Sequence, residues 1–204
     1  MTRPTVSRTC GWFRRCPMPT ARWPIRRRAA GSTTIEFALT ASVFFLFAFG
    51  LLEMARILFV WNAAADGIHR AARQMAVTDF TDAGAVNSVR AAAMLSNGGT
   101  MPLGGGINGT YVLIEYLDRN RAVIPTLPPC PVYNVRNCLD DSAGACIRFV
   151  RARLCLPGTS CTPVPYQPLF AAVIPDGAIT LPTFEATVPA ATLGYRPGTA
   201  SACP

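Results

Sequence analysis

Acidic residues are missing from the first 31 positions of this 204-residue chain, whereas arginine is frequent there. Eight arginines lie in this segment, and the other eleven are balanced by eleven carboxylates in residues 32–204. A nucleic-acid-binding domain would carry its positive charge on the folded part of the chain. This distribution therefore disfavours a nucleic-acid partner and favours a signal for membrane topology.

Histidine is almost absent, since His69 is the single one, and the sequence has no Cys-x-x-Cys pair. We therefore expect no metal site. The motifs of serine hydrolases, zinc peptidases and P-loops are also missing. A Gly-x-Gly-x-x-Gly run at Gly104, Gly106 and Gly109 lacks the flanking strand and helix of a dinucleotide site. We predict no enzymatic activity, no cofactor and no small-molecule substrate.

The longest single feature is an apolar run from Phe37 to Leu52, sixteen residues without a charge. About 20 helical residues cross a hydrocarbon core of ~30 Å, so residues 37–56 are the expected transmembrane part. Glu53 and Arg56, one turn apart, can pair at the far interface, where the arginine stem can reach lipid headgroups.

The arginine-rich flank sets the expected orientation, because short basic flanks stay in the cytoplasm. Residues 1–31 are predicted to be a basic cytoplasmic leader, with Met18 as an alternative start that would shorten it. The chain after the membrane segment is predicted to be exported, and the membrane is the first expected partner.

The apolar run is expected to continue as one helix over about residues 32–77, because no proline interrupts it. Its outer half carries an apolar seam with spacings of three and four residues, made by Met54, Ile57, Trp61, Ala64, Ile68, Ala71 and Met75. Such a seam packs either on this protein's own domain or on neighbouring subunits, and the sequence leaves both open.

Residues 78–204 are predicted to form a small exported domain. Because it has both helix and strand patterns, the expected fold class is α+β. A second helix is expected from about residue 82 to residue 96, capped by Thr81 or Asp82. Short β-branched and aromatic segments predict an antiparallel sheet with strands at 110–118, 146–156 and 183–189, and a possible strand at 169–175. The connection 125–145 is expected to be a surface loop.

Six cysteines fall in the predicted exported part: Cys130, Cys138, Cys146, Cys155, Cys161 and Cys203. An even number in an oxidising compartment indicates disulfides. Six cysteines allow fifteen pairings, and the sequence does not choose among them. The short spacing between Cys155 and Cys161 suggests that these two close a local turn.

The junction between leader and helix has a distinctive order: arginines, Gly31, four residues, Glu36, Phe37, then the apolar run. It resembles the cleavage site of type IV prepilins, in which a membrane aspartyl peptidase cuts after the glycine. That resemblance implies a cut between Gly31 and Ser32. In type IV pilins the early glutamate pairs with the freed amine, so Glu36 would assist subunit assembly. The alternative is an ordinary anchor whose glutamate reaches the cytoplasmic headgroups.

The resemblance extends over about 45 residues. The positions that carry it are Glu36 to Leu39, then Phe49, Gly50, Glu53 and Arg56, and the stretch from Arg70 to Arg73. Together they are similar to the N-terminal segment of TadE-like proteins. These are pseudopilins, or minor pilins, of the tight-adherence (Tad, Flp) pilus system. The resemblance implies a single-pass protein of the bacterial inner membrane, with prepilin peptidase and other Tad pilus subunits as partners.

The small residues Ala63 to Ala65 imitate a signal-peptidase site, but the apolar run before them is too long for a signal peptide and is interrupted by Glu53 and Arg56. Two other interpretations stay open. A TadG-like or other anchored assembly factor would share the helix without entering a filament. An anchored enzyme or binding domain unrelated to pili is the second.

Overall fold

The computed structural model describes residues 32–95, 99–140, 144–158, 160–171 and 174–198. The leader therefore lies outside the described residues. By their internal contacts, residues 1–41 and 42–204 form two units. The expected long helix is present as α1, Ser32–Met75, two residues shorter at its end than the sequence predicts. No proline interrupts it, since the first proline after Ser32 is Pro102.

A second helix, α2 (Ala83–Ala93), follows after a short turn. Asp82 is its N-cap, and the Asp82 carboxylate accepts hydrogen bonds from the backbone N–H groups of Gly84 and Ala85. A carboxylate at this place satisfies N–H groups that have no partner within the helix. The predicted start is thus confirmed, whereas the helix ends before residue 96.

Three strands form the main sheet: β1 (Val112–Leu117), β2 (Phe149–Leu154) and β5 (Glu185–Pro189). The order is β1-β2-β5, and both pairings are antiparallel, as predicted. The 3-10 turn η1 (Gly109–Tyr111) leads into β1. A separate two-stranded ladder joins β3 (Val164–Pro165) to β4 (Thr180–Leu181).

The central strand β2 shows why the sheet packs on the helix. Val150, Ala152 and Leu154 are fully buried, and they alternate with Arg151 and Arg153. Successive side chains of a strand point to opposite faces. One face of β2 therefore enters the core, and the other presents arginines to the carboxylates of β1 and β5.

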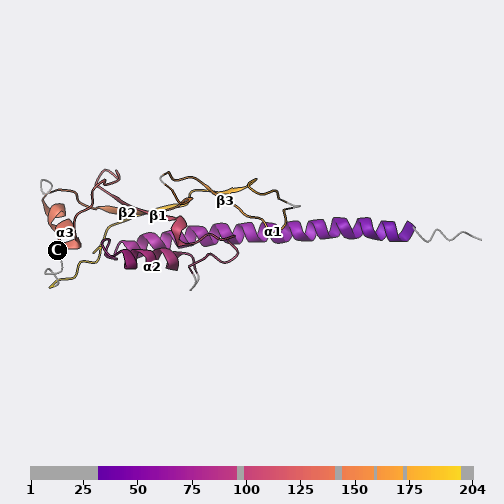
Figure 1. Cartoon of the computed structure of the whole chain (residues 1–204), viewed down its shortest axis with the longest axis horizontal. Helices are drawn as coiled ribbons and strands as arrows, with labels where there is room; N and C mark the ends of the chain where they lie inside the picture. The colour runs from indigo at the N-terminus through magenta and orange to yellow at the C-terminus, as the bar shows by residue number, and fades with distance from the viewer. Residues whose placement is uncertain (1–31, 96–98, 141–143, 159, 172–173, 199–204) are drawn as a thin grey trace, which may run out of the picture. The chain divides into compact units, whose positions relative to one another are not determined.

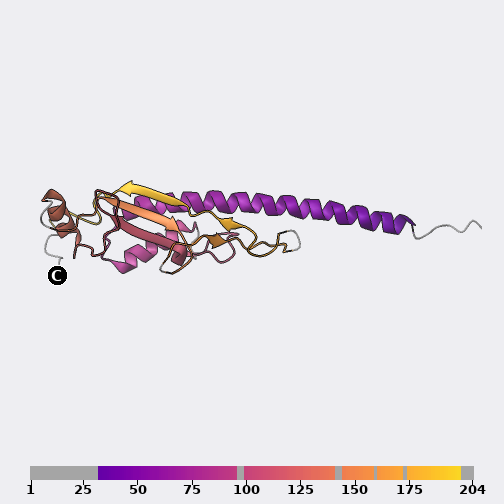
Figure 2. The ribbon, with the colours of Figure 1, turned by 90° about the horizontal axis from the view of Figure 1, so that it is seen from above.

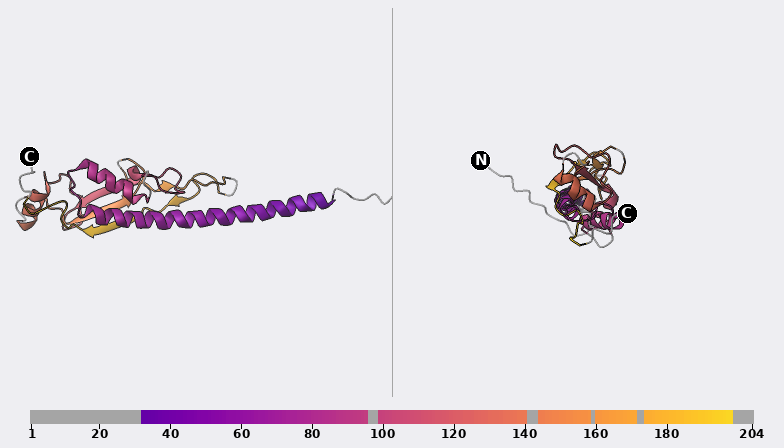
Figure 3. Two further views of the ribbon diagram at one scale, coloured as in Figure 1. Left: turned by 90° about the horizontal axis from the view of Figure 1, so that it is seen from below. Right: turned by 90° about the vertical axis from the view of Figure 1, so that its left-hand side faces the viewer.

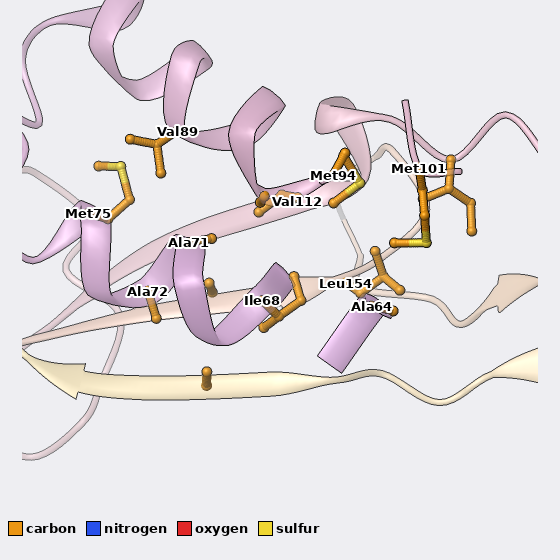
Figure 4. Close-up of a cluster of buried hydrophobic side chains, with 14 of the residues drawn as sticks. Ala64, Ile68, Ala71, Ala72, Met75, Val89, Met94, Met101, Val112 and Leu154 are labelled. Carbon is orange, nitrogen blue, oxygen red and sulfur yellow. The ribbon is translucent and has the colours of Figure 1, made fainter. Parts of the chain in front are cut away.

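The hydrophobic core lies between the C-terminal part of α1, α2 and the sheet (Figure 4). The longitudinal views show α2 and the sheet running alongside this part of α1 (Figures 1 and 2). Figure 3 shows the same elements gathered beside the helix when the domain is seen end-on. The two helices approach closely at Gly67, because a Cβ added there would collide with the carbonyl oxygen of Ala93.

Two predictions for residues 78–204 are wrong. The connection 125–145 contains a helix, α3 (Pro131–Leu139), with proline at its first turn. Proline is favoured there because its fixed φ suits a helix start, so Pro131 was an available signal. In addition, the described residues of 169–175 form no strand, since they belong to the connection between β3 and β4. There the chain bonds to α1 instead of to the sheet.

Candidate functional site

The predicted cleavage site lies at the edge of the described structure. Gly31 is outside the described residues, and Ser32 is the first residue of α1. Glu36 and Phe37 lie on the first turns of the helix, and both are exposed. The hydroxyl of Thr40 donates to the backbone carbonyl of Glu36 at 2.8 Å. The roles proposed for these residues stay predictions.

The part of α1 that follows is apolar and open. Phe44, Phe45, Leu46 and Phe47 each keep more than half of their surface exposed. Among the described residues, α1 is the one helix long and apolar enough to cross a membrane. An exposed surface of this size on a water-soluble domain would be unusual.

A buried polar cluster begins one turn after Phe49, and we call it the clasp: Glu53, Arg56, Tyr166, and the backbone of Leu103, Gln167 and Leu169. Glu53 is 1% exposed. Its Oε1 accepts hydrogen bonds from the Tyr166 hydroxyl at 2.5 Å and from Arg56 Nη1 at 3.1 Å. The backbone N–H of Leu169 also donates to this carboxylate.

Arg56 is the centre of the clasp. Its Nε donates to the carbonyl of Leu103 at 2.9 Å, and its Nη1 donates to the carbonyl of Gln167 at 2.7 Å. Its guanidinium also lies over the Tyr166 ring, 5.0 Å from the centroid. A buried charge is tolerated when such bonds replace its hydration. The pair therefore ties two distant loops of the domain to α1.

The clasp corrects one expectation and confirms another. Glu53 and Arg56 do pair, as predicted. However, Arg56 does not extend toward lipid headgroups, because its own domain covers it and leaves it 7% exposed. Burial and the hydrogen bond to Glu53 raise the pKa of Tyr166 to about 12. Tyr166 is therefore a neutral hydroxyl donor at physiological pH.

Comparison with known proteins gives a family match, and it covers most of α1. Residues 31–73 match the model of the TadE-like protein family. We call residues 31–73 the TadE-like segment. No curated protein and no solved structure gives a significant match to the chain. The TadE-like segment contains the predicted cleavage glycine, Glu36 and both charged residues of the clasp. The α+β domain after residue 75 lies outside the matched region.

The predicted seam of α1 contains both buried and exposed residues. Ile57, Ala64, Ile68, Ala71 and Met75 are all buried against the protein's own domain. Met54 is 59% exposed and Trp61 is 36% exposed. Most of the seam is therefore core. A contact of Met54 and Trp61 with another subunit stays a prediction.

Six of the eight cysteines lie after the TadE-like segment. Disulfides join Cys138 to Cys146 and Cys155 to Cys161, so the expected local turn is confirmed. Cys130 is also disulfide-bonded. Cys203 lies outside the described residues. The bridge between Cys138 and Cys146 joins α3 to the chain that enters β2.

The clasp residues outside α1 could not be found from sequence. Leu103 and Tyr166 are 47 and 110 residues away from Arg56 along the chain. Two of the three loop groups that bind Arg56 are backbone carbonyls, for which any residue type would serve. Tyr166 stands in a proline-rich stretch that carries no recognisable motif.

Proposed function

We propose that this protein is a TadE-like pseudopilin, or minor pilin, that takes part in assembling Tad (Flp) adhesive pili. The observation that carries the proposal is the extent of the family match. It begins at Gly31, where the prepilin-like junction places the cut, and it ends at Arg73, close to the end of α1. In this role the protein is a structural subunit, and it catalyses no reaction.

Prepilin peptidase removes the leader after Gly31 and leaves Ser32 with a new amino group. Glu36 lies about one helical turn further on. A carboxylate near the hydrocarbon core is costly, about 2–3 kcal/mol, unless it has a partner. The new amine, from the same subunit or from a neighbour, serves as that partner when subunits associate.

The orientation in the inner membrane follows from the charges. The basic leader stays in the cytoplasm, and the α+β domain faces the periplasm or the cell exterior. The disulfides of the domain support this orientation, because such bonds persist in oxidising compartments. Partners in this proposal are the membrane, prepilin peptidase and other Tad pilus subunits.

N-terminal sequencing of the membrane-bound protein, from cells with a working prepilin peptidase, tests the proposal. We expect the sequence to begin at Ser32. A protein beginning at Asp66 would instead indicate signal-peptide removal, and an intact leader would indicate a plain anchor. Either result contradicts the pilin role.

A variant of the early glutamate separates a filament subunit from a TadG-like assembly factor. We expect Glu36→Leu to lower both pilus number and incorporation into pili about tenfold or more, at an unchanged level of membrane protein. Asp66→Asn is the matched control, because Asp66 is an exposed acid further along the same helix. Normal pili with Glu36→Leu would contradict the assembly role of this carboxylate.

A further inference from the structure

Two loops of the domain meet α1 at the clasp, and we call them the collar loops: residues 101–106 and 167–171. Carbonyl groups of both loops accept hydrogen bonds from Arg56. The loops also touch each other, because a Cβ added to Gly105 would lie 2.8 Å from the Cβ of Gln167. They therefore form one surface beside the helix.

The collar loops present apolar side chains outward. Leu103 is 56% exposed and Leu169 is 64% exposed. Phe170 stacks on Phe49 of α1, with 4.6 Å between the ring centroids. The surface of the collar is thus continuous with the exposed apolar part of α1.

Charge is almost absent from the chain that carries these loops. Residues 91–114 contain no charged residue, and residues 154–184 contain only Asp176. The outer face of the sheet, by contrast, carries a network of arginines and glutamates. Neither segment offers a cation to an anionic headgroup, so a lipid contact here would rest on apolar groups.

The level of the collar along α1 points to the bilayer boundary. On the side of the helix that the domain leaves open, Leu51, Met54 and Leu58 stay more than half exposed. The open face becomes polar only after Trp61, at Asn62 and Asp66. The loops contact α1 at residues 49–56, which is ~8–18 Å before Trp61 at ~1.5 Å per residue. Tryptophan is favoured at membrane interfaces.

We propose that the collar loops insert into the phospholipid bilayer at the boundary between headgroups and acyl chains, with Leu103 and Leu169 in contact with lipid. The proposal rests on the membrane anchoring assumed in the proposed function. The collar loops cover Glu53 and Arg56 and so shield both charges from the hydrocarbon. Through this contact the domain rests directly on the membrane, and the depth of α1 in the bilayer is fixed.

Lipid quenching of single tryptophans tests the proposal. The full chain, with Trp12, Trp23 and Trp61 changed to Phe, receives one tryptophan by Leu169→Trp or Leu103→Trp and is reconstituted in phosphatidylcholine vesicles. The acyl chains are brominated near their headgroup end. Leu139→Trp is the matched control, because Leu139 is 86% exposed on α3, which lies at the end of the domain away from β3 (Figure 1).

We expect lipid bromine to quench the tryptophan at 169 or 103 about threefold or more above the tryptophan at 139. The excess should persist in about 0.5 M NaCl, because screening does not weaken an apolar contact. Equal quenching at 169, 103 and 139 would overturn the proposal, provided that thermal melting shows the variants to be folded.

Phe44→Trp separates this result from a failure of the anchor itself. If the tryptophan at 44 is quenched while those at 169 and 103 are not, the helix spans the membrane and only the collar proposal fails. If the tryptophan at 44 is unquenched too, the membrane anchor and the collar proposal both fail. An unquenched tryptophan at 169 whose emission shifts to the blue as the protein-to-lipid ratio rises would assign the surface to a second copy of the chain.

Discussion

Two stretches of α1 have opposite surroundings. Residues 42–52 carry no charge, and large side chains such as Phe44, Phe45 and Leu51 are exposed there. In residues 57–75 the face toward the domain is buried, and small side chains such as Ala64 stand among the larger ones on it. The small residues let α2 and the sheet come close to the helix. Small side chains on the buried face and charged ones such as Arg70 on the open face therefore distinguish the second stretch from the first.

The clasp marks the boundary between the two stretches, and its removal should have the largest effect. We expect Arg56→Met to lower the free energy of unfolding by about 3 kcal/mol, because it leaves Glu53 and two loop carbonyls buried with fewer partners. Denaturant unfolding of the full chain in detergent, followed by circular dichroism, measures this.

The control for Arg56→Met is Arg70→Met on the same helix. Arg70 pairs with Asp66 at 2.6 Å, but both side chains are about half exposed. Water and salt screen such a pair, so we expect a loss below about 1 kcal/mol. Equal losses in the two variants would contradict the distinction between the stretches.

Substitutions at two glycines of α1, one in each stretch, should change the free energy of unfolding by a smaller amount. We expect Gly67→Ala to destabilise the protein by about 1–3 kcal/mol, because the new Cβ collides with the Ala93 carbonyl oxygen of α2. Gly50 has no atom within 4 Å of its added Cβ. Gly50→Ala should therefore be neutral or slightly stabilising, because alanine favours a helix. The same unfolding assay compares them.

The smallest effect is a dependence on alkaline pH. The pKa of Tyr166 is raised to about 12 from an ordinary value of 10, so the fold favours its neutral form. Its contribution is complete below pH 10 and is lost as the pH rises toward 12. We expect the stability of Tyr166→Phe to fall less than that of the wild type over this range, by of order 1 kcal/mol.

Two other tyrosines frame that measurement. Burial also raises the pKa of Tyr116 to about 12, so part of the alkaline loss should remain in Tyr166→Phe. Tyr133→Phe on α3 is the control, because Tyr133 is 42% exposed. Unfolding curves at pH 9, 10 and 11 compare the proteins. Identical curves for Tyr166→Phe and the wild type would contradict the role of the clasp hydroxyl.

The sequence predicted the elements whose signals are local. The long apolar run predicted α1, Thr81 or Asp82 marked the start of α2, and β-branched and aromatic residues such as Phe149 and Val150 indicated the strand β2. The helix α3 was not predicted, because its cysteine- and proline-rich surroundings indicated a loop. The sequence also could not decide what the seam of α1 packs against, because a neighbouring subunit and the protein's own domain require the same spacing.

The clasp was half predictable for a similar reason. Glu53 and Arg56 stand one turn apart, so helical geometry alone brings them together. Their burial depends on loops more than 40 residues away, which contribute mainly backbone groups. Hydrogen bonds to backbone leave no trace in residue identity. The ion pair was therefore predictable from the sequence, whereas its burial by the domain was not.

One helix, α1, contains both the exposed apolar stretch and part of the domain core, and this has a mechanical consequence. Val60, Ala64 and Ile68 complete the interior of the domain, and the clasp binds the same helix a few residues earlier. No flexible linker separates residue 53 from the interior, so axial movement of the helix carries the sheet with it. A proteolytic cut after Ala65 would release a domain missing part of its own interior.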